Sequence, residues 1–181
     1  MKNKISLEYA EALFLLACEQ NQSKEYLDDL RFVNSVLKEN AELLLMLSSP
    51  NLTEKEKEDV TDAVFGSALK EDTVSFIKLL CQKGRAELLP ICIEDYEKLY
   101  NQVNKIEIAE VTSAVPLTED EKAALISSLE QKTGHKIELV CHVDKEILGG
   151  IIIRTQDSVL DGSLKRKIHS IKEVIKSEPK A

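Results

Sequence analysis

Apolar residues in the first hundred positions recur every three or four residues. In the opening segment, Ile5, Tyr9, Leu13, Leu16 and Ala17 therefore share one face of a helix. Similar spacing predicts a second helix that begins near Ser23 and carries residues 27–37. Four more are expected at about 41–47, 53–66, 71–82 and 87–104.

Local residue chemistry supports these limits. Thr53 with Glu56 forms a capping box at the start of the fourth helix. Pro50 requires the third helix to stop before it, and Gly84 closes the fifth. Pro90 is compatible with the sixth helix only in its first turn. The segment 1–105 thus reads as a six-helix bundle.

The period changes after Lys105. Residues 106–108 and 137–143 alternate as strands, and residues 151–155 and 158–160 resemble a hairpin. A second capping box, Thr118 with Glu121, starts a helix that ends at Gly134, and a last helix spans about 163–176. The prediction is a mainly helical α+β protein, with the bundle followed by a small α/β domain with a short sheet over residues 106–181.

Composition narrows the function classes. The net charge of −8 opposes nucleic acid as the main ligand, because phosphate binding requires a positive field. No apolar run approaches the roughly 20 residues that cross a bilayer, so direct membrane insertion is not expected. The N-terminus matches neither a secretory signal nor a transit peptide, which favours a soluble bacterial protein over an organellar one.

The four cysteines have apolar neighbours in the sequence and form no C-x-x-C pair. We expect them to be buried free thiols in a reducing compartment. They are Cys18, Cys81, Cys92 and Cys141.

Motifs for catalysis or cofactor binding are not recognisable. The six glycines match neither the P-loop nor the dinucleotide-binding pattern, so no cofactor is predicted. His135, Cys141 and His142 are close in sequence, but Cys141 and His142 point to opposite faces of a strand, so Cys141 is expected in the core and His142 outside. Acidic residues such as Glu54 and Glu58 are typical of solvated helix faces, and no catalytic residue is predicted.

Two features leave a choice open. The first helix also carries Leu7, Phe14 and Leu15, which widens its apolar surface beyond one stripe. In one interpretation, which the residues alone favour, this helix packs into the core on two sides. In the other, one side packs into the core and the other side forms a groove for a partner helix. In the last helix, the basic first turn 165–167 is either a solvated face or a patch for an acidic partner.

The chain resembles the delta subunit of F-type ATP synthase, called oligomycin-sensitivity-conferring protein in mitochondria. The strongest likeness covers residues 137–163, including the paired glycines Gly149-Gly150, then Asp157 and Asp161-Gly162-Ser163. Residues 9–14 (YAEALF) and the junction Gly84-Arg85 with Leu88-Leu89-Pro90 are weaker family features. Gln156 stands where the family commonly has glycine, so that turn is expected to differ locally.

The resemblance implies a non-catalytic adapter in the stator, which keeps the catalytic head from turning with the rotor. It implies that the bundle binds N-terminal segments of the alpha subunits, and that the second domain meets the C-terminal ends of the b subunits. Location would be peripheral, on the cytoplasmic face of the bacterial inner membrane. The implied alpha-subunit groove lies between helices one and five and would use Tyr9, Ala12, Leu13, Leu16, Phe76, Leu79 and Leu80.

For the second domain, the resemblance makes the basic turn a b-subunit contact. That turn is Lys165, Arg166 and Lys167. The remaining signature residues would build the fold through close packing, a turn and a helix cap. They are Gly149, Gly150, Asp157, Asp161, Gly162 and Ser163. Two alternatives remain at this point: a small soluble enzyme with a helical lid domain, and a generic helical interaction module.

Overall fold

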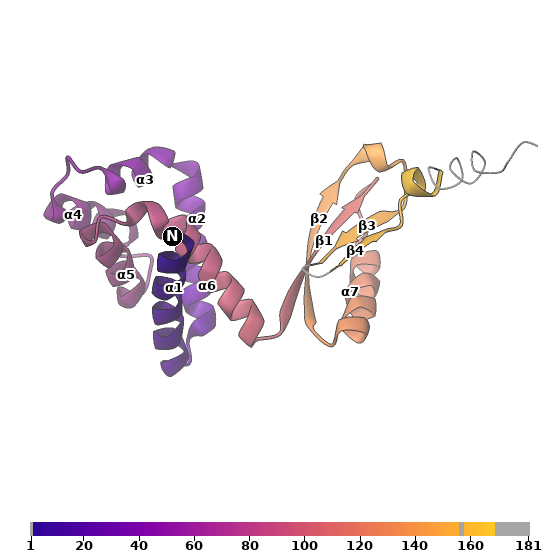
Figure 1. The fold of residues 1–181 in the computed structure, drawn as a ribbon, viewed down its shortest axis with the longest axis horizontal. Helices are drawn as coiled ribbons and strands as arrows, with labels where there is room; N and C mark the ends of the chain where they lie inside the picture. The colour runs from indigo at the N-terminus through magenta and orange to yellow at the C-terminus, as the bar shows by residue number, and fades with distance from the viewer. Residues whose placement is uncertain (1, 156–157, 169–181) are drawn as a thin grey trace, which may run out of the picture. The chain divides into compact units, whose positions relative to one another are not determined.

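The computed structural model describes residues 2–155 and 158–168 (Figure 1). The chain divides into two compact units, Met1–Val103 and Asn104–Ala181, here called the N unit and the C unit. The division falls beside Lys105, where the period of the sequence pattern changes from helical to alternating.

The N unit is built from α-helices joined by short connections. They are α1 (Lys2–Glu19), α2 (Ser23–Glu39), α3 (Ala41–Ser48), α4 (Glu54–Phe65), α5 (Glu71–Gln82) and α6 (Leu89–Val103). The predicted helical bundle is confirmed, but its helix count omitted a 3-10 turn, η1 (Ala86–Leu88). Gly84, at φ 62°, ends α5, and η1 redirects the chain so that α6 begins two residues later than predicted, with Pro90 in its first turn.

The core of the N unit joins aliphatic side chains to a few fully buried aromatic ones. Tyr96 is inaccessible to solvent, and its ring meets Phe14 edge-on at 5.4 Å between centroids. Its hydroxyl donates to the carbonyl oxygen of Ser23 at 3.0 Å. Burial with this partner avoids the cost of an unpaired polar group, so Tyr96 ties α6 to α1 and to the start of α2.

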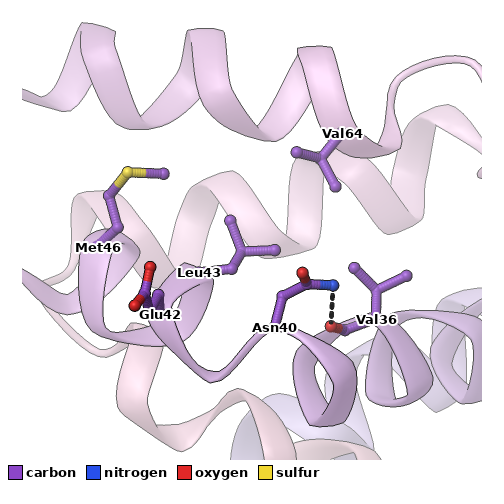
Figure 2. A pocket seen from close by; sticks show the side chains of 6 residues that line it. All are labelled: Val36, Asn40, Glu42, Leu43, Met46 and Val64. Carbon is purple, nitrogen blue, oxygen red and sulfur yellow. Dashed lines mark hydrogen bonds between the residues drawn. The ribbon is translucent and has the colours of Figure 1, made fainter.

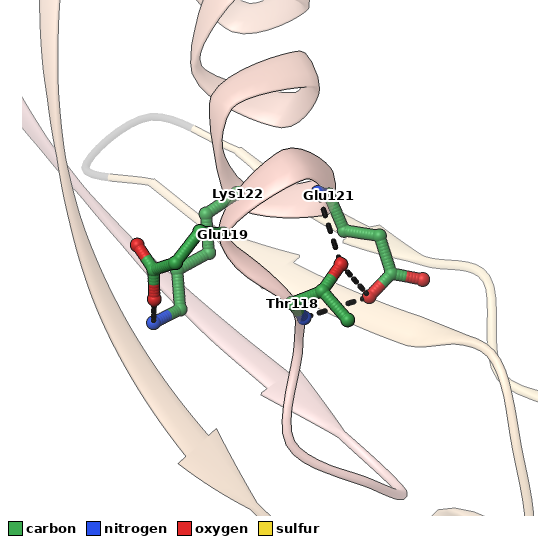
Figure 3. Close-up of polar contacts among 4 residues, drawn as sticks. All are labelled: Thr118, Glu119, Glu121 and Lys122. Carbon is green, nitrogen blue, oxygen red and sulfur yellow. Dashed lines mark hydrogen bonds and ion pairs between the residues drawn. The ribbon is translucent and has the colours of Figure 1, made fainter.

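Both predicted capping boxes are present. At the start of α4, the Thr53 hydroxyl accepts from the backbone N–H of Glu56 at 3.3 Å. Figure 3 shows the same arrangement at the start of α7 (Glu119–Thr133), where the Glu121 carboxylate also accepts from the Thr118 N–H at 2.8 Å. This backbone hydrogen bond, with that from the Thr118 hydroxyl, lowers the pKa of Glu121. The boxes therefore satisfy helix-terminal N–H groups that would otherwise have no partner.

Thr118→Ala should destabilise the C unit by about 1 kcal/mol, because the cap of α7 is lost. Thr53→Ala is the matched variant, with a similar loss in the N unit. Urea unfolding monitored residue by residue by amide NMR separates the two effects. The contribution of Glu121 should be complete above its unfolded-state pKa and be lost as the pH falls through its lowered folded-state pKa. Equal effects of both variants on both units would contradict this expectation.

The C unit is a four-stranded sheet in the order β2-β1-β3-β4. The strands are β1 (Ile106–Ser113), β2 (Lys136–Val143), β3 (Ile151–Arg154) and β4 (Val159–Asp161). β1 pairs in parallel with β2, and α7 connects them across one face of the sheet (Figure 1). β3 pairs antiparallel with both β1 and β4, which confirms the predicted hairpin.

The first strand is longer than the predicted 106–108. It continues to Ser113 because it lies inside the sheet and has a paired strand on each side. Ala109, Val111 and Ser113 alternate with exposed or half-buried residues. The small Ala and Ser side chains hid this alternation, since they weaken the hydrophobic signal on which a strand prediction depends.

Burial was predicted wrongly for two of the four cysteines. Cys81 and Cys92 are buried, and burial raises the pKa of the Cys92 thiol to about 12, but Cys18 and Cys141 are exposed. Cys18 follows the buried Ala17 by one position, and one residue turns a helix by about 100°, so apolar sequence neighbours did not place it in the core. Cys141 lies on the edge strand β2, and His142 beside it is also exposed.

Candidate partner-binding surface

Helices α1 and α5 lie side by side in the N unit and run in opposite directions (Figure 1). Near the middle of α1, the Tyr9 ring meets Phe76 edge-on at 6.5 Å between centroids, and the Tyr9 hydroxyl accepts from Arg85 Nη1 at 2.9 Å. Just after the end of α1, Gln20 Nε2 donates to Asp72 Oδ2 at 2.8 Å. Contacts from the middle of α1 and from just beyond its end therefore hold this pair of helices together.

The residues predicted for the alpha-subunit groove divide into a buried group and an exposed group. Leu13, Phe76 and Leu80 are buried members of the N-unit core. The others reach the surface, with Leu16 37% and Leu79 39% exposed. We call the accessible set the α1–α5 strip; its members are Tyr9, Ala12, Leu16 and Leu79. The strip is a continuation of the core outward rather than a separate feature.

Polar contacts at the α1–α2 corner were not foreseen from the sequence. The buried Tyr26 donates its hydroxyl hydrogen bond to Asp72 Oδ2 at 2.6 Å. Burial, then this contact, raises the pKa of Tyr26 to about 12. Hydrogen bonds from Tyr26 and Gln20 lower the pKa of Asp72, so it is ionised at neutral pH. The sequence offered one signal for this group of contacts, the carboxylate of Asp72 in the first turn of α5.

Arg85 likewise received no role from the sequence beyond its place in the family-like junction. Its guanidinium lies 5.7 Å from the centroid of the Tyr9 ring, a cation–π geometry. Arg85 therefore contacts one of the four strip residues directly.

The paired glycines of the C unit lie against the segment that leads out of β4. Gly149 O accepts from Leu164 N at 3.0 Å, and Gly162 N donates to Ile151 O at 2.9 Å. Gly150 has φ 78°, and a Cβ built there would lie 2.4 Å from the carbonyl oxygen of Gly162. Gly150 therefore requires glycine, because of both the close backbone approach and its positive φ.

The segment after β4 begins a helix. Asp161 Oδ1 accepts from Ser163 N at 2.9 Å, and the buried Ser163 hydroxyl accepts from Arg166 N at 3.2 Å, which is N-cap geometry. Residues 164–168 are helical, and Lys165, Arg166 and Lys167 are exposed on it. Gln156, Asp157 and the rest of the predicted last helix lie outside the described residues.

A pocket of about 370 Å³ opens between α2, α3 and α4, and no residue of the α1–α5 strip lines it (Figure 2). Its polar lining is small: Asn40 Nδ2 donates to Val36 O of its own helix at 3.1 Å, and Glu42 lies at the edge. The other lining residues are Leu43, Met46 and Val64. These groups do not form the nucleophile, base and oxyanion constellation that the enzyme alternative needs.

The described part of the chain shows neither a metal-binding cluster nor a membrane-spanning helix. Across residues 2–155 and 158–168, no three His, Cys, Asp or Glu side chains converge to hold a metal ion. His135, considered above as a possible ligand, instead has Nδ1 at 3.6 Å from Glu107 Oε2. In the same described ranges, no helix combines the length and apolar character needed to span a bilayer.

Comparison with known proteins agrees with the fold. The family model described as ATP synthase delta (OSCP) subunit matches residues 5–175. The chain belongs to this family. ATP synthase subunit delta of Clostridium perfringens is 34% identical over 175 residues, covering 97% of this chain and 98% of its own length. The protein of that name from Chlorobaculum parvum is 35% identical over 174 residues and 96% of each chain.

Membership in the delta (OSCP) family makes the chain a structural, non-catalytic component of an ATP synthase, of the stator or peripheral-stalk type. A solved chain of the Toxoplasma gondii mitochondrial ATP synthase hexamer superposes with a TM-score of 0.72 at 19% identity. It covers 96% of this chain and 98% of that chain, and it supports the fold. The family indicated by the sequence resemblance, the predicted fold class and the predicted structural, non-enzymatic role are confirmed.

Proposed function

We propose that the α1–α5 strip binds amphipathic N-terminal segments of the ATP synthase alpha subunits. The observation that carries this is an exposed apolar surface on two helices whose other sides complete the core. Leu16 and Leu79 are too large and too apolar to gain from solvent exposure. A partner helix that covers them would gain this burial without any change in the N-unit core.

The C unit would supply the other end of the link. We propose that the exposed residues Lys165, Arg166 and Lys167 contact the C-terminal ends of the b subunits, with acidic groups there as the complement. Gly149, Gly150 and Ser163 would position this turn rather than contact a partner. Bridging head and stalk, the protein would lie peripherally on the cytoplasmic face of a bacterial inner membrane and resist rotor torque.

Leu16→Glu and Leu79→Glu should each weaken binding of an alpha-subunit peptide at least about tenfold, equal to about 1.4 kcal/mol. The peptide is the first about 20 residues of the alpha subunit, which span about 30 Å when helical. Calorimetric titration measures affinity and heat capacity, and a negative heat-capacity change is expected from apolar burial.

Leu45→Glu is the matched control, because Leu45 is 71% exposed on α3, outside the strip. It should bind like the unmodified chain. Unchanged affinity in both strip variants would reject the strip as the binding surface. Failure of the unmodified, folded chain to bind the peptide would reject the alpha-subunit contact altogether.

A further inference from the structure

On α1, the α1–α5 strip continues into a carboxylate. Tyr9, Ala12, Leu16 and Glu19 follow one another at intervals of three, four and three residues, which keeps them on one side of the helix. Glu19 is exposed and is the last residue of α1. The strip therefore ends in a negative charge at the C-terminus of α1.

On α5, the strip lies between opposite charges. Asp72, Phe76, Leu79 and Lys83 follow at intervals of four, three and four residues, again on one side. Asp72 is in the first turn of α5, and the exposed Lys83 is its C-cap. The acidic end and the basic end of this row are separated by the whole length of α5.

The antiparallel arrangement brings Glu19 of α1 and Asp72 of α5 to one end of the strip, while the basic residues that follow α5 lie at the other end. The Gln20–Asp72 hydrogen bond places Glu19 and Asp72 together, and the Arg85–Tyr9 hydrogen bond places Arg85 and Lys83 at the other end. An apolar surface with one acidic end and one basic end results.

Nearby charges of opposite sign do not cancel this polarity. At the acidic end, the positive charge of Lys70 acts on Asp72, but the exposed Glu71 adds a further negative charge, so this end stays net negative. At the basic end, Glu8 lies four residues before Ala12 and therefore on the same side of α1, where its negative charge weakens but does not outweigh the two positive charges of Lys83 and Arg85.

We propose that these end charges set the direction in which a partner helix lies on the strip, with its acidic end at Lys83 and Arg85 and its basic end at Glu19 and Asp72. This rests on the proposed docking of a helix there. Helices that are stable on their own carry acidic residues in the first turn and basic residues in the last turn. The N-terminus of such a helix lies at Lys83 and Arg85, so the helix runs parallel to α1. The side-chain charges decide this direction, because they are unit charges whereas each helix terminus carries only about half a charge.

Two synthetic helices that share one apolar face test this proposal. The first has Glu in its first turn and Lys in its last turn, and the second has these charges exchanged. Each carries a nitroxide at its N-terminus and is added to the isotope-labelled full chain. The nitroxide broadens the signals of nearby amide groups. The first peptide should therefore erase the amide signals of Lys83 and Arg85, and the second those of Glu19 and Gln20. At about 1 M ionic strength, where the screening length is about 3 Å, the preference should disappear.

A charge exchange within the chain, Glu19→Lys with Lys83→Glu, is the matched variant, and both sites are exposed. It should abolish the directional preference of both peptides, because each end then carries charges of both signs while Asp72 and Arg85 are unchanged. If both peptides bind the unmodified chain in the same direction, or the exchange leaves their direction unchanged, the directional proposal is wrong while docking on the strip stands. If neither peptide shifts the amide signals of Leu16 and Leu79 of the folded chain, docking and direction both fail.

Discussion

Gly150→Ala is expected to destabilise the C unit by about 3 kcal/mol. The new Cβ would lie 2.4 Å from the backbone carbonyl oxygen of Gly162, and neither backbone can yield without breaking the Gly162–Ile151 hydrogen bond. Overpacking costs about 1–3 kcal/mol. The φ of 78° adds about 1 kcal/mol, because an L side chain disfavours that conformation.

Gly134→Ala isolates the clash from the backbone conformation. Gly134 has φ 71°, but a Cβ there would meet no heavy atom within 4 Å, so the loss should be only about 1 kcal/mol. Urea unfolding followed by far-UV circular dichroism compares the variants. All eight aromatic residues precede residue 101, so tyrosine fluorescence reports the N unit and should not change. Equal midpoints for the two variants would contradict the proposed clash.

Leu13→Glu should unfold the N unit, with a loss above about 4 kcal/mol. Leu13 is only 5% exposed and belongs to the core, so the new carboxylate would be buried without a designed partner. Near-UV circular dichroism of the tyrosines and amide NMR measure the loss of packing. A variant of Leu13 therefore reports folding rather than partner binding.

Leu16→Glu is the control for that experiment. It lies three residues further along α1 and is 37% exposed, so its carboxylate reaches water and stability should change by less than about 1 kcal/mol. A folded N unit in Leu13→Glu would mean that Leu13 is accessible on the strip and that the division of the groove residues into a buried and an exposed group is wrong. The two variants thus separate the core role of α1 from its surface role.

Interactions between residues close in sequence are the part of the fold that could be predicted. The capping boxes at Thr53 and Thr118 join residues three positions apart, and the helix stop at Gly84 depends on one backbone angle. The family signature in the C unit is also local, running from Gly149 to Ser163. Such signals are visible without knowledge of the tertiary structure.

Exposure of individual side chains required the assembled fold. The sequence placed Leu13 and Leu16 on one face, yet packing buries one and exposes the other. Cys18 and Cys141 were assigned to the core because of their sequence neighbours, which do not share their surroundings. Whether a side chain is buried depends on its exact angle around the helix axis or on whether its strand lies at the sheet edge. Hydrophobic periodicity does not resolve these differences.

The sequence alone indicated most of the helices and strands and the family, since each depends on residues within one helix, strand or turn. Only the tertiary structure decided how the strip is bounded. Gln20 and Asp72 are 52 positions apart, and Tyr9 and Arg85 are 76 apart. Their contacts exist because α1 and α5 pack against a common core, and no local pattern encodes that pairing.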